Sequence, residues 1–300
     1  PTSDEFATTL HPPTHRTPSQ GGVARGAPAW NLPQADRERY LLHGVVAEGG
    51  HGRILQAQDR HLERMVALKE PLSSGTSEER FLREARITAR LQHPSIVPVY
   101  EAGRWPGGGP FYAMKLVSGR SLAHLIESMR TLSERLGALP HVLAVTEAIA
   151  YAHSQRVVHR DLKPSNILVG EFGETVVIDW GLAKELDRPE EPGADATPTP
   201  PGSPEPERTQ LGTVMGTPAY MPPEQAEDAA GATVGSDVYG LGATLYALLT
   251  GRPPFPPDEP PLVTLRRVRE EEPAPPRRLR LELPRDLEVI CLKCLEKDPA

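Results

Sequence analysis

The run His159-Arg160-Asp161-Leu162-Lys163-Pro164-Ser165-Asn166, followed by Asp179-Trp180-Gly181, decides the fold of this 300-residue chain. Asp161 stands five residues before Asn166 and 18 residues before Asp179. Carboxylate and amide oxygens are hard ligands, the kind that magnesium prefers in proteins. His-Arg-Asp alone would be weak evidence for any particular chemistry, whereas the whole octapeptide followed by Asp-Trp-Gly at this distance is strong evidence.

These residue types at this spacing suit phosphoryl transfer from a magnesium nucleotide to a hydroxyl group. Asp161 can accept the hydroxyl proton, and Asn166 and Asp179 can hold metal ions. The sequence contains no G-x-x-x-x-G-K-[ST] motif, so a P-loop nucleotidase is disfavoured.

The chain resembles a protein kinase catalytic domain and is most similar to the eukaryotic-like Ser/Thr kinases of bacteria. The likeness covers about residues 37–300. It implies a two-lobe α+β fold, with a five-stranded antiparallel sheet plus one helix in the N-lobe, 37–117, and a mainly helical C-lobe, 118–300. Residues 1–36 are rich in Pro, Thr, Ser and Gly and are expected to be disordered.

Residues 187–210 carry seven prolines and six acidic residues. This composition cannot build a packed element, so we expect a disordered insertion in the activation segment, between Asp179 and Glu224.

Hydrophobic periodicity locates the regular elements within the two lobes. Strands are predicted over 40–47, 53–59, 65–70, 96–102 and 111–116. Helices are predicted over 77–91, 136–155, 236–250 and 283–296.

Composition excludes several classes of protein. The net charge of −7 gives no basic footprint for nucleic acid. The longest nearly apolar run, 238–250, is too short to span a bilayer, and no signal peptide begins the chain. We therefore expect a cytoplasmic domain, a fragment of a longer protein, with a membrane segment beyond residue 300 left open. Cys291 and Cys294 are expected to be small buried residues rather than a metal or redox pair.

Glu48-Gly49-Gly50-His51-Gly52 joins the first two strands as a turn whose backbone N–H groups can approach phosphates. Taken alone, such a turn more often means a flexible hairpin. The resemblance implies that it covers the phosphates of ATP. Ala47 replaces the first glycine of the family pattern while Gly49 and Gly52 match, which leaves the nucleotide affinity open.

Lys69 lies on the third strand, and Glu84 follows 15 residues later on the next helix. An isolated strand lysine is more often simply exposed. The resemblance implies instead that Lys69 contacts the α- and β-phosphates and pairs with Glu84. It also implies an adenine site built by Ile54, Ala67, Leu168, Met114, Lys115 and Val117.

The resemblance also assigns the catalytic roles. Asp161 is expected to orient the substrate hydroxyl and accept its proton, and Lys163 to neutralise charge on the γ-phosphate. Asn166 and Asp179 are expected to hold Mg²⁺ ions. Catalysis would then rest on positioning and charge stabilisation.

Supporting residues are implied in the same way. His159 is expected to pack against Trp180, which stands where the family has phenylalanine. Asp237 is expected to hold the backbone of the catalytic loop. Glu224 is expected to pair with an arginine that lies beyond residue 300.

Two features favour Ser/Thr over Tyr as the acceptor. Lys-Pro-x-Asn after Arg-Asp is the Ser/Thr form of the loop, and Thr217 within 216–224 would bridge toward Asp161 and Lys163. Arg160 implies control by phosphorylation, since a phosphothreonine carries about −1.5 to −2 charge. Thr209 and Thr213 are the candidates for autophosphorylation.

The predicted function is ATP-dependent, non-specific serine/threonine protein kinase activity on protein substrates. One of these is the chain itself, modified in trans through transient dimers. A pseudokinase or nucleotide-binding scaffold is the alternative, favoured by Ala47 and the acidic insertion and opposed by the retained site residues. A small-molecule kinase is disfavoured because 216–224 suits a peptide platform.

Overall fold

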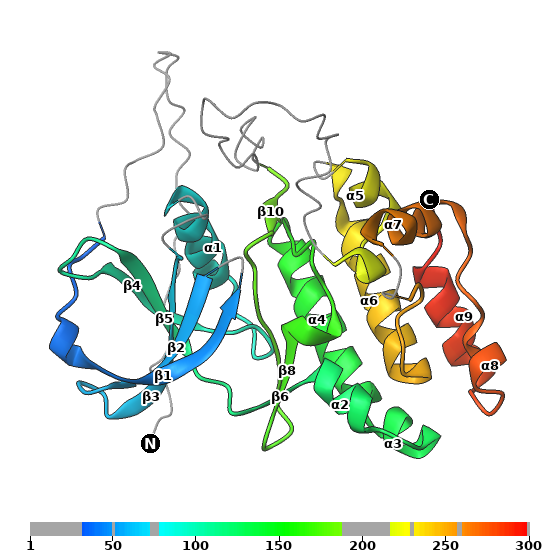
Figure 1. Ribbon diagram of the computed structural model, residues 1–300, viewed down its shortest axis with the longest axis horizontal. Coiled ribbons are helices and arrows are strands. Elements are labelled where there is room, and N and C mark those ends of the chain that lie inside the picture. The colour runs from blue at the N-terminus through cyan, green and yellow to red at the C-terminus, as the bar shows by residue number, and fades with distance from the viewer. Residues whose placement is uncertain are drawn as a thin grey trace, which may run out of the picture. The chain divides into compact units, whose positions relative to one another are not determined.

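The computed structural model describes residues 32–49, 52–72, 78–187, 217–228, 231–256 and 260–298 (Figure 1). The predictions for the first 31 residues, for nearly all of the acidic insertion, and for Thr209 and Thr213 lie outside these residues.

The N-lobe is a five-stranded antiparallel sheet with one helix, as predicted. Its strand order is β1-β2-β3-β5-β4, and α1 contacts β4 and β5 (Figure 1). The elements are β1 (Tyr40–Gly49), β2 (Gly52–Asp59), β3 (Arg64–Glu70), α1 (Glu78–Arg90), β4 (Val99–Arg104) and β5 (Pro110–Lys115). A short 3₁₀ helix, η1 (Arg37–Arg39), precedes the sheet.

Aromatic and aliphatic side chains fill one face of this sheet. Trp105 stacks on Phe111 with ring centroids 4.1 Å apart, and Tyr40 meets both rings edge-on. Leu68 is fully buried in the same cluster. Burying such side chains contributes about 1.5–3 kcal/mol each, so this cluster fixes the sheet that carries Lys69.

Residues 32–36 of the expected N-terminal linker are described, and part of this segment runs beside β4. The backbone N–H of Ala35 donates to Arg104 O (2.8 Å), and that of Arg104 donates to Pro33 O (3.0 Å). Ala35 also packs on the aromatic cluster. These residues therefore extend the edge of the N-lobe sheet.

One predicted strand starts too early. Sequence periodicity placed it at 96–102, but β4 begins at Val99. Ile96 forms an isolated parallel bridge with Val177 of the C-lobe instead and is 1% exposed. The apolar pattern at Ile96 thus reflects burial between the lobes rather than membership of the N-lobe sheet.

The C-lobe is mainly helical, as predicted. Its helices are α2 (Leu122–Ser128), α3 (Leu132–Gly137), α4 (Leu139–Ser154), α5 (Pro223–Glu227), α6 (Val234–Thr250), α7 (Pro261–Glu270), α8 (Pro276–Leu279) and α9 (Arg285–Cys294). Short strands β6 (Gly119–Ser121), β8 (Ile167–Gly170) and β9 (Thr175–Val177) form one small sheet. A second joins β7 (Val157–Val158) to β10 (Lys184–Glu185), and 3₁₀ turns form η2 (Pro164–Asn166) and η3 (Pro218–Tyr220).

The predicted helix over 136–155 corresponds to α4, except that residues 136 and 137 form the end of the separate helix α3. Proline lacks an N–H group and is best accommodated in the first turn of a helix, so Pro140 marks a new start. Thr131 and Glu134 form a capping box that begins α3 separately. Another capping box, made by Thr233 and Ser236, starts α6 two residues before the predicted 236.

Helix α9 is also shorter than predicted, since it begins at Arg285, directly after Pro284, and ends at Cys294. It packs closely on α6, which lies between α4 and α9 (Figure 1). A Cβ atom at Gly242 would lie 2.6 Å from the Cβ of Cys294. Burial raises the pKa of both thiols, Cys291 and Cys294, which suits packing rather than reactivity.

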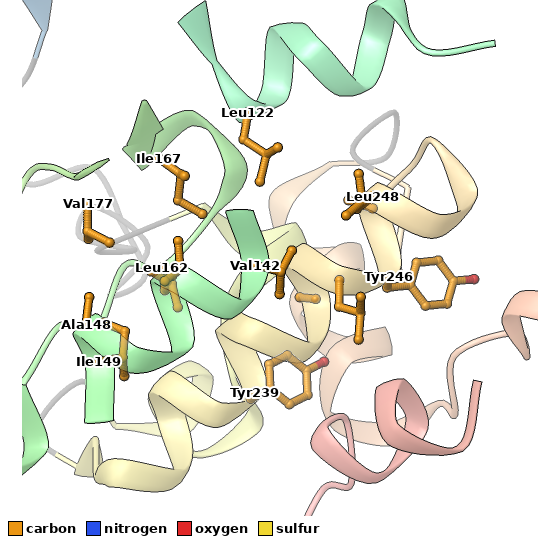
Figure 2. Close-up of a cluster of buried hydrophobic side chains, with 14 of the residues drawn as sticks. Leu122, Val142, Ala148, Ile149, Leu162, Ile167, Val177, Tyr239, Tyr246 and Leu248 are labelled. Carbon is orange, nitrogen blue, oxygen red and sulfur yellow. The ribbon is translucent and has the colours of Figure 1, made fainter. Parts of the chain in front are cut away.

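The catalytic loop, residues 159–166, packs against the core of the C-lobe. Leu162, which follows Asp161, is 3% exposed and belongs to the same cluster as Val142 and Ile149 of α4 (Figure 2). A Cβ atom at Gly240 of α6 would lie 3.0 Å from Leu162 Cβ, so α6 also approaches the loop closely. The core thereby fixes the backbone directly after Asp161. No helix in the described part of the chain is long and apolar enough to cross a membrane.

Candidate active site

The side chain of Asp161 lies at the centre of a small hydrogen-bonded group. Lys163 Nζ donates to Asp161 Oδ2 over 2.6 Å and to Thr217 Oγ1 over 2.8 Å. Asn166 Nδ2 donates to the backbone O of Asp161 (2.8 Å) and to its Oδ2 (3.1 Å). The expected bridge from Thr217 through Lys163 to Asp161 is confirmed.

Asp237 anchors the backbone of the catalytic loop, as expected. It lies in the first turn of α6 and is 1% exposed. Its Oδ2 accepts from the backbone N–H of His159 (2.8 Å), and its Oδ1 accepts from that of Arg160 (2.9 Å). His153 Nε2 is a third contact, 2.8 Å from Oδ2. A buried carboxylate therefore fixes the two residues that precede Asp161.

His159 packs against Trp180, as expected. The ring centroids lie 4.6 Å apart at an interplanar angle of 60°, and His159 Nε2 lies 3.2 Å from Ile178 O. Trp180 is 1% exposed, so the pocket holds the larger indole in place of a phenylalanine ring. The catalytic loop and the Asp-Trp-Gly segment are thus packed together.

Lys69 and Glu84 form a buried ion pair between β3 and α1. Lys69 Nζ lies 2.5 Å from Glu84 Oε1 and 3.5 Å from Asp179 Oδ1. Burial on its own would lower the pKa of Lys69, but the carboxylates of Glu84 and Asp179 outweigh it and hold the pKa above its ordinary value. Lys69 is therefore a cation at neutral pH.

Tyr112 is a site residue that the sequence reasoning missed. Its hydroxyl donates to Glu84 Oε1 over 2.7 Å from the neighbouring strand β5. A tyrosine in the middle of an apolar strand was a usable signal, because a buried phenol usually has a hydrogen-bond partner.

Asp179 and Gly181 show why this turn needs its particular residues. Asp179 has φ 63°, in the left-handed region that aspartate tolerates better than most residues. A Cβ atom at Gly181 would lie 3.2 Å from Glu84 Oε2 and 3.3 Å from Asp179 Oδ1. Glycine therefore lets the turn approach the Lys69–Glu84 pair closely.

The residues expected to hold Mg²⁺ have suitable chemistry. Asn166 commits its amide nitrogen to Asp161, which leaves its amide oxygen available as a ligand, and Asp179 adds a carboxylate. Within the described residues no group of three His, Cys, Asp or Glu side chains could hold a metal ion. One carboxylate and one amide suit a cation that completes its shell with waters and phosphate oxygens.

The glycine-rich turn is only partly described, because Gly50 and His51 lie outside the described residues. Gly49 pairs with Gly52 at the end of the β1–β2 hairpin. Gly52 has φ 129°, and a Cβ atom there would lie 2.5 Å from Glu70 O, so only glycine fits. Ala47 is opposite Ile54 and next to an irregularity in the ladder.

The expected adenine residues come from both lobes. Ala67 and Met114 are direct partners across β3 and β5 and are 3% and 8% exposed. Ile54 lies on β2 opposite Lys69, and Leu168 is partly buried on β8 of the C-lobe. Two further residues of the set, Lys115 and Val117, lie at the end of β5 and just after it.

Glu224 has a partner inside the described chain. Ser236 Oγ donates to Glu224 Oε1 over 2.7 Å, which joins α5 to the first turn of α6. The arginine expected beyond residue 300 stays a prediction.

Comparison with known proteins agrees with this geometry. Residues 40–300 match the family model of the protein kinase domain, so the chain belongs to the protein kinase family. Together with the bacterial relatives below, which are named serine/threonine-protein kinases, this match supports a kinase domain of the eukaryotic-like bacterial Ser/Thr type.

Three relatives illustrate the similarity. Serine/threonine-protein kinase PknD of Protochlamydia amoebophila is 37% identical over 72% of this chain and 23% of its own length. Serine/threonine-protein kinase PknB of Mycolicibacterium smegmatis is 35% identical over 89% of this chain and 41% of its own length. The DNA damage-responsive serine/threonine-protein kinase RqkA of Deinococcus radiodurans is 36% identical over 79% of this chain and 33% of its own length. The chain thus spans less than half the length of these relatives.

Proposed function

We propose that this domain transfers the γ-phosphate of ATP to serine and threonine hydroxyls of proteins. The observation that carries the proposal is that two lysines at the site each join two functional side chains. Lys163 joins Asp161 to Thr217, and Lys69 joins Glu84 to Asp179. Together they provide a proton acceptor and two lysine cations from both lobes, as phosphoryl transfer requires.

In this mechanism Asp161 orients the substrate hydroxyl and accepts its proton. Lys163, already 2.6 Å from Asp161 Oδ2, stabilises negative charge on the group being transferred. Lys69 binds the α- and β-phosphates while Glu84 holds its ammonium in place. Mg²⁺ bound by Asn166 and Asp179 would supply charge neutralisation on the phosphate oxygens.

The nucleotide would lie between the lobes. We assign the phosphates to the β1–β2 turn through Ala47, Gly49 and Gly52. The adenine contacts are assigned to Ile54, Ala67, Leu168, Met114, Lys115 and Val117. The ladder partners Ala67 and Met114 support this choice, because they place a small and a flexible apolar side chain side by side.

Protein hydroxyls are the acceptors we favour. Thr217 bonds Lys163 and begins the segment 217–223, whose η3 turn and prolines form an ordered platform beside Asp161. The chain itself is one proposed substrate, at Thr209 or Thr213, phosphorylated in trans within a transient dimer. A phosphate there would add about −1.5 to −2 charge, for which Arg160 of the catalytic loop is the proposed partner. Because ATP is the donor, we place the reaction in the cytoplasm.

Labelled ATP with magnesium tests the proposal on the wild type and Asp161→Ala. We expect incorporation into the wild type that maps to Thr209 or Thr213 and is lost in the variant. A panel of proteins and small metabolites offered with the same ATP should show transfer to proteins. If the wild type binds MgATP without transferring phosphate, the domain is a nucleotide-binding scaffold instead.

A further inference from the structure

Tyr112 and Lys69 converge on one oxygen atom of Glu84. The two are direct partners across β3 and β5, so their side chains leave the same face of the sheet. Glu84 Oε1 accepts from Lys69 Nζ (2.5 Å) and from the Tyr112 hydroxyl (2.7 Å). All three residues are 5% exposed or less.

We propose that Tyr112 is a positioning residue for phosphoryl transfer, whose hydroxyl fixes Glu84 in the orientation that grips Lys69. The inference rests on the proposed function, since it assigns a task to a residue behind the same site. Tyr112 itself touches no atom that reacts.

The flexibility of Lys69 and Glu84 must be limited if the ion pair is to keep one geometry. Glu84 and Lys69 have long side chains with several rotatable bonds, and the contact of Lys69 Nζ with Asp179 Oδ1 is long, at 3.5 Å, so a further hydrogen bond to Glu84 restricts the pair. A tyrosine ring has only two such bonds. Phe81 of α1 packs against the Tyr112 ring, with centroids 5.2 Å apart, and this contact fixes the place of the hydroxyl.

The other side of the carboxylate is closed as well. Gly181 approaches Glu84 Oε2 so closely that a Cβ atom there would lie 3.2 Å away. Glu84 is thus enclosed by Lys69, Tyr112 and the Asp-Trp-Gly turn. Rotation of Glu84 away from Lys69 requires the hydrogen bond to Tyr112 to break.

The hydroxyl is protonated, and is therefore a hydrogen-bond donor, at neutral pH. Burial, together with the nearby Glu84 carboxylate, raises the pKa of Tyr112 well above its ordinary value, so the phenol keeps its proton. A phenylalanine would fill the same space and keep the packing on Phe81. Packing therefore accounts for the ring of Tyr112 but not for its hydroxyl, whose contact is the hydrogen bond to Glu84.

The test compares Tyr112→Phe with a matched control, Tyr246→Phe. Tyr246 is fully buried in the C-lobe, and its hydroxyl donates to Ala274 O over 2.9 Å. Both variants lose one hydroxyl hydrogen bond from a buried ring, but only Tyr112 contacts the site. Steady-state kinetics with a protein substrate, well below the melting temperature, gives kcat and KM for ATP.

We expect Tyr112→Phe to lower kcat/KM for ATP by about tenfold, the effect of one hydrogen bond to a charged group. Tyr246→Phe should stay within about twofold of the wild type, since its hydroxyl bond lies outside the site. KM for the protein substrate should not change in either variant. Equal kcat/KM values for the two variants would overturn the inference.

A second background separates positioning from general damage. If Tyr112 acts through Glu84, then Tyr112→Phe in the Glu84→Ala variant, which has no acceptor for the hydroxyl, should lower activity by less than about twofold further, because coupled residues are not additive. A full additional loss would show that the hydroxyl acts elsewhere.

Nucleotide binding keeps the inference testable by itself. If the wild type transfers no phosphate, the proposed function fails, and calorimetry with MgATP then decides the role of Tyr112. Binding severalfold weaker in Tyr112→Phe than in Tyr246→Phe supports positioning of Lys69, and equal binding rejects it.

Discussion

Asp237→Asn is the substitution that probes the anchoring of the catalytic loop most sharply. The side chain keeps its shape but loses its charge and one of its two acceptor oxygens. Asp237 accepts backbone N–H groups from His159 and Arg160, on different oxygens. The amide NH₂ of asparagine would therefore face one of these donors, with no acceptor to offer it.

The expected magnitude follows from those contacts. A buried donor left without a partner costs about 1–3 kcal/mol, and the remaining bond loses its charge assistance, about 1 kcal/mol more. We expect Asp237→Asn to lower the free energy of unfolding by about 2–4 kcal/mol in total. That is a large share of the 5–15 kcal/mol that typical domains have. The catalytic loop should also lose alignment, so kcat should fall more than KM for ATP rises.

Urea unfolding followed by circular dichroism measures the stability, with Asp286→Asn as the control. Asp286 is exposed in the first turn of α9, where the same change should cost at most about 1 kcal/mol. If Asp237→Asn is no more destabilising than Asp286→Asn, the carboxylate does not anchor the loop and the reasoning is refuted.

Three further substitutions test other parts of the structure. Arg135 is 3% exposed and donates to three backbone carbonyls near the ends of α2 and α6. Arg135→Met should therefore lower the free energy of unfolding, measured in urea, by about 2–4 kcal/mol. An unchanged free energy of unfolding would contradict this capping role. Burial lowers the pKa of His141, which contacts Thr175 Oγ1, so stability is lost as pH falls below about 6.5, where the unfolded chain takes up the proton more readily. His141→Gln should therefore show a flatter decline in melting temperature from pH 7.5 to 5.5, and an unchanged decline would argue against it. Arg90 of α1 lies 2.5 Å from Glu185 of β10, so Glu185→Gln should speed amide hydrogen exchange in both elements. The change should lower the free energy of unfolding by about 1 kcal/mol or less, because the Arg90 side chain is 60% exposed. Faster exchange in β10 alone would show that the ion pair does not link the two elements.

Much of the site was readable from the sequence, because its parts are short motifs with fixed spacing. Asp161, Lys163 and Asn166 lie within one loop, so their proximity follows from the chain itself. The pairing of Lys69 with Glu84 could also be predicted, since a strand and the following helix bring them together.

A tyrosine in an apolar strand signals that Tyr112 has a hydrogen-bond partner, but motif spacing does not identify Glu84 as that partner. The contact of Tyr112 with Glu84 depends on the register of β3 against β5, and no local pattern in the sequence encodes that register. Element boundaries are also hard to predict where one hydrophobic period continues across the boundary between two helices. The apolar residues from 136 onward fit one helical period, yet Ala138 ends α3, and α4 starts directly after it with Pro140 in its first turn.

The central claim is that the assembled site catalyses transfer and does not merely bind nucleotide. MgATP binding and phosphate transfer should be measured on the same samples of wild type and Asp161→Asn. The account predicts that the variant binds MgATP nearly as well as the wild type while transfer falls by about 10²–10⁴-fold, the usual contribution of a general base. A wild type that binds MgATP without transferring phosphate, or a variant that transfers at the wild-type rate, would contradict it.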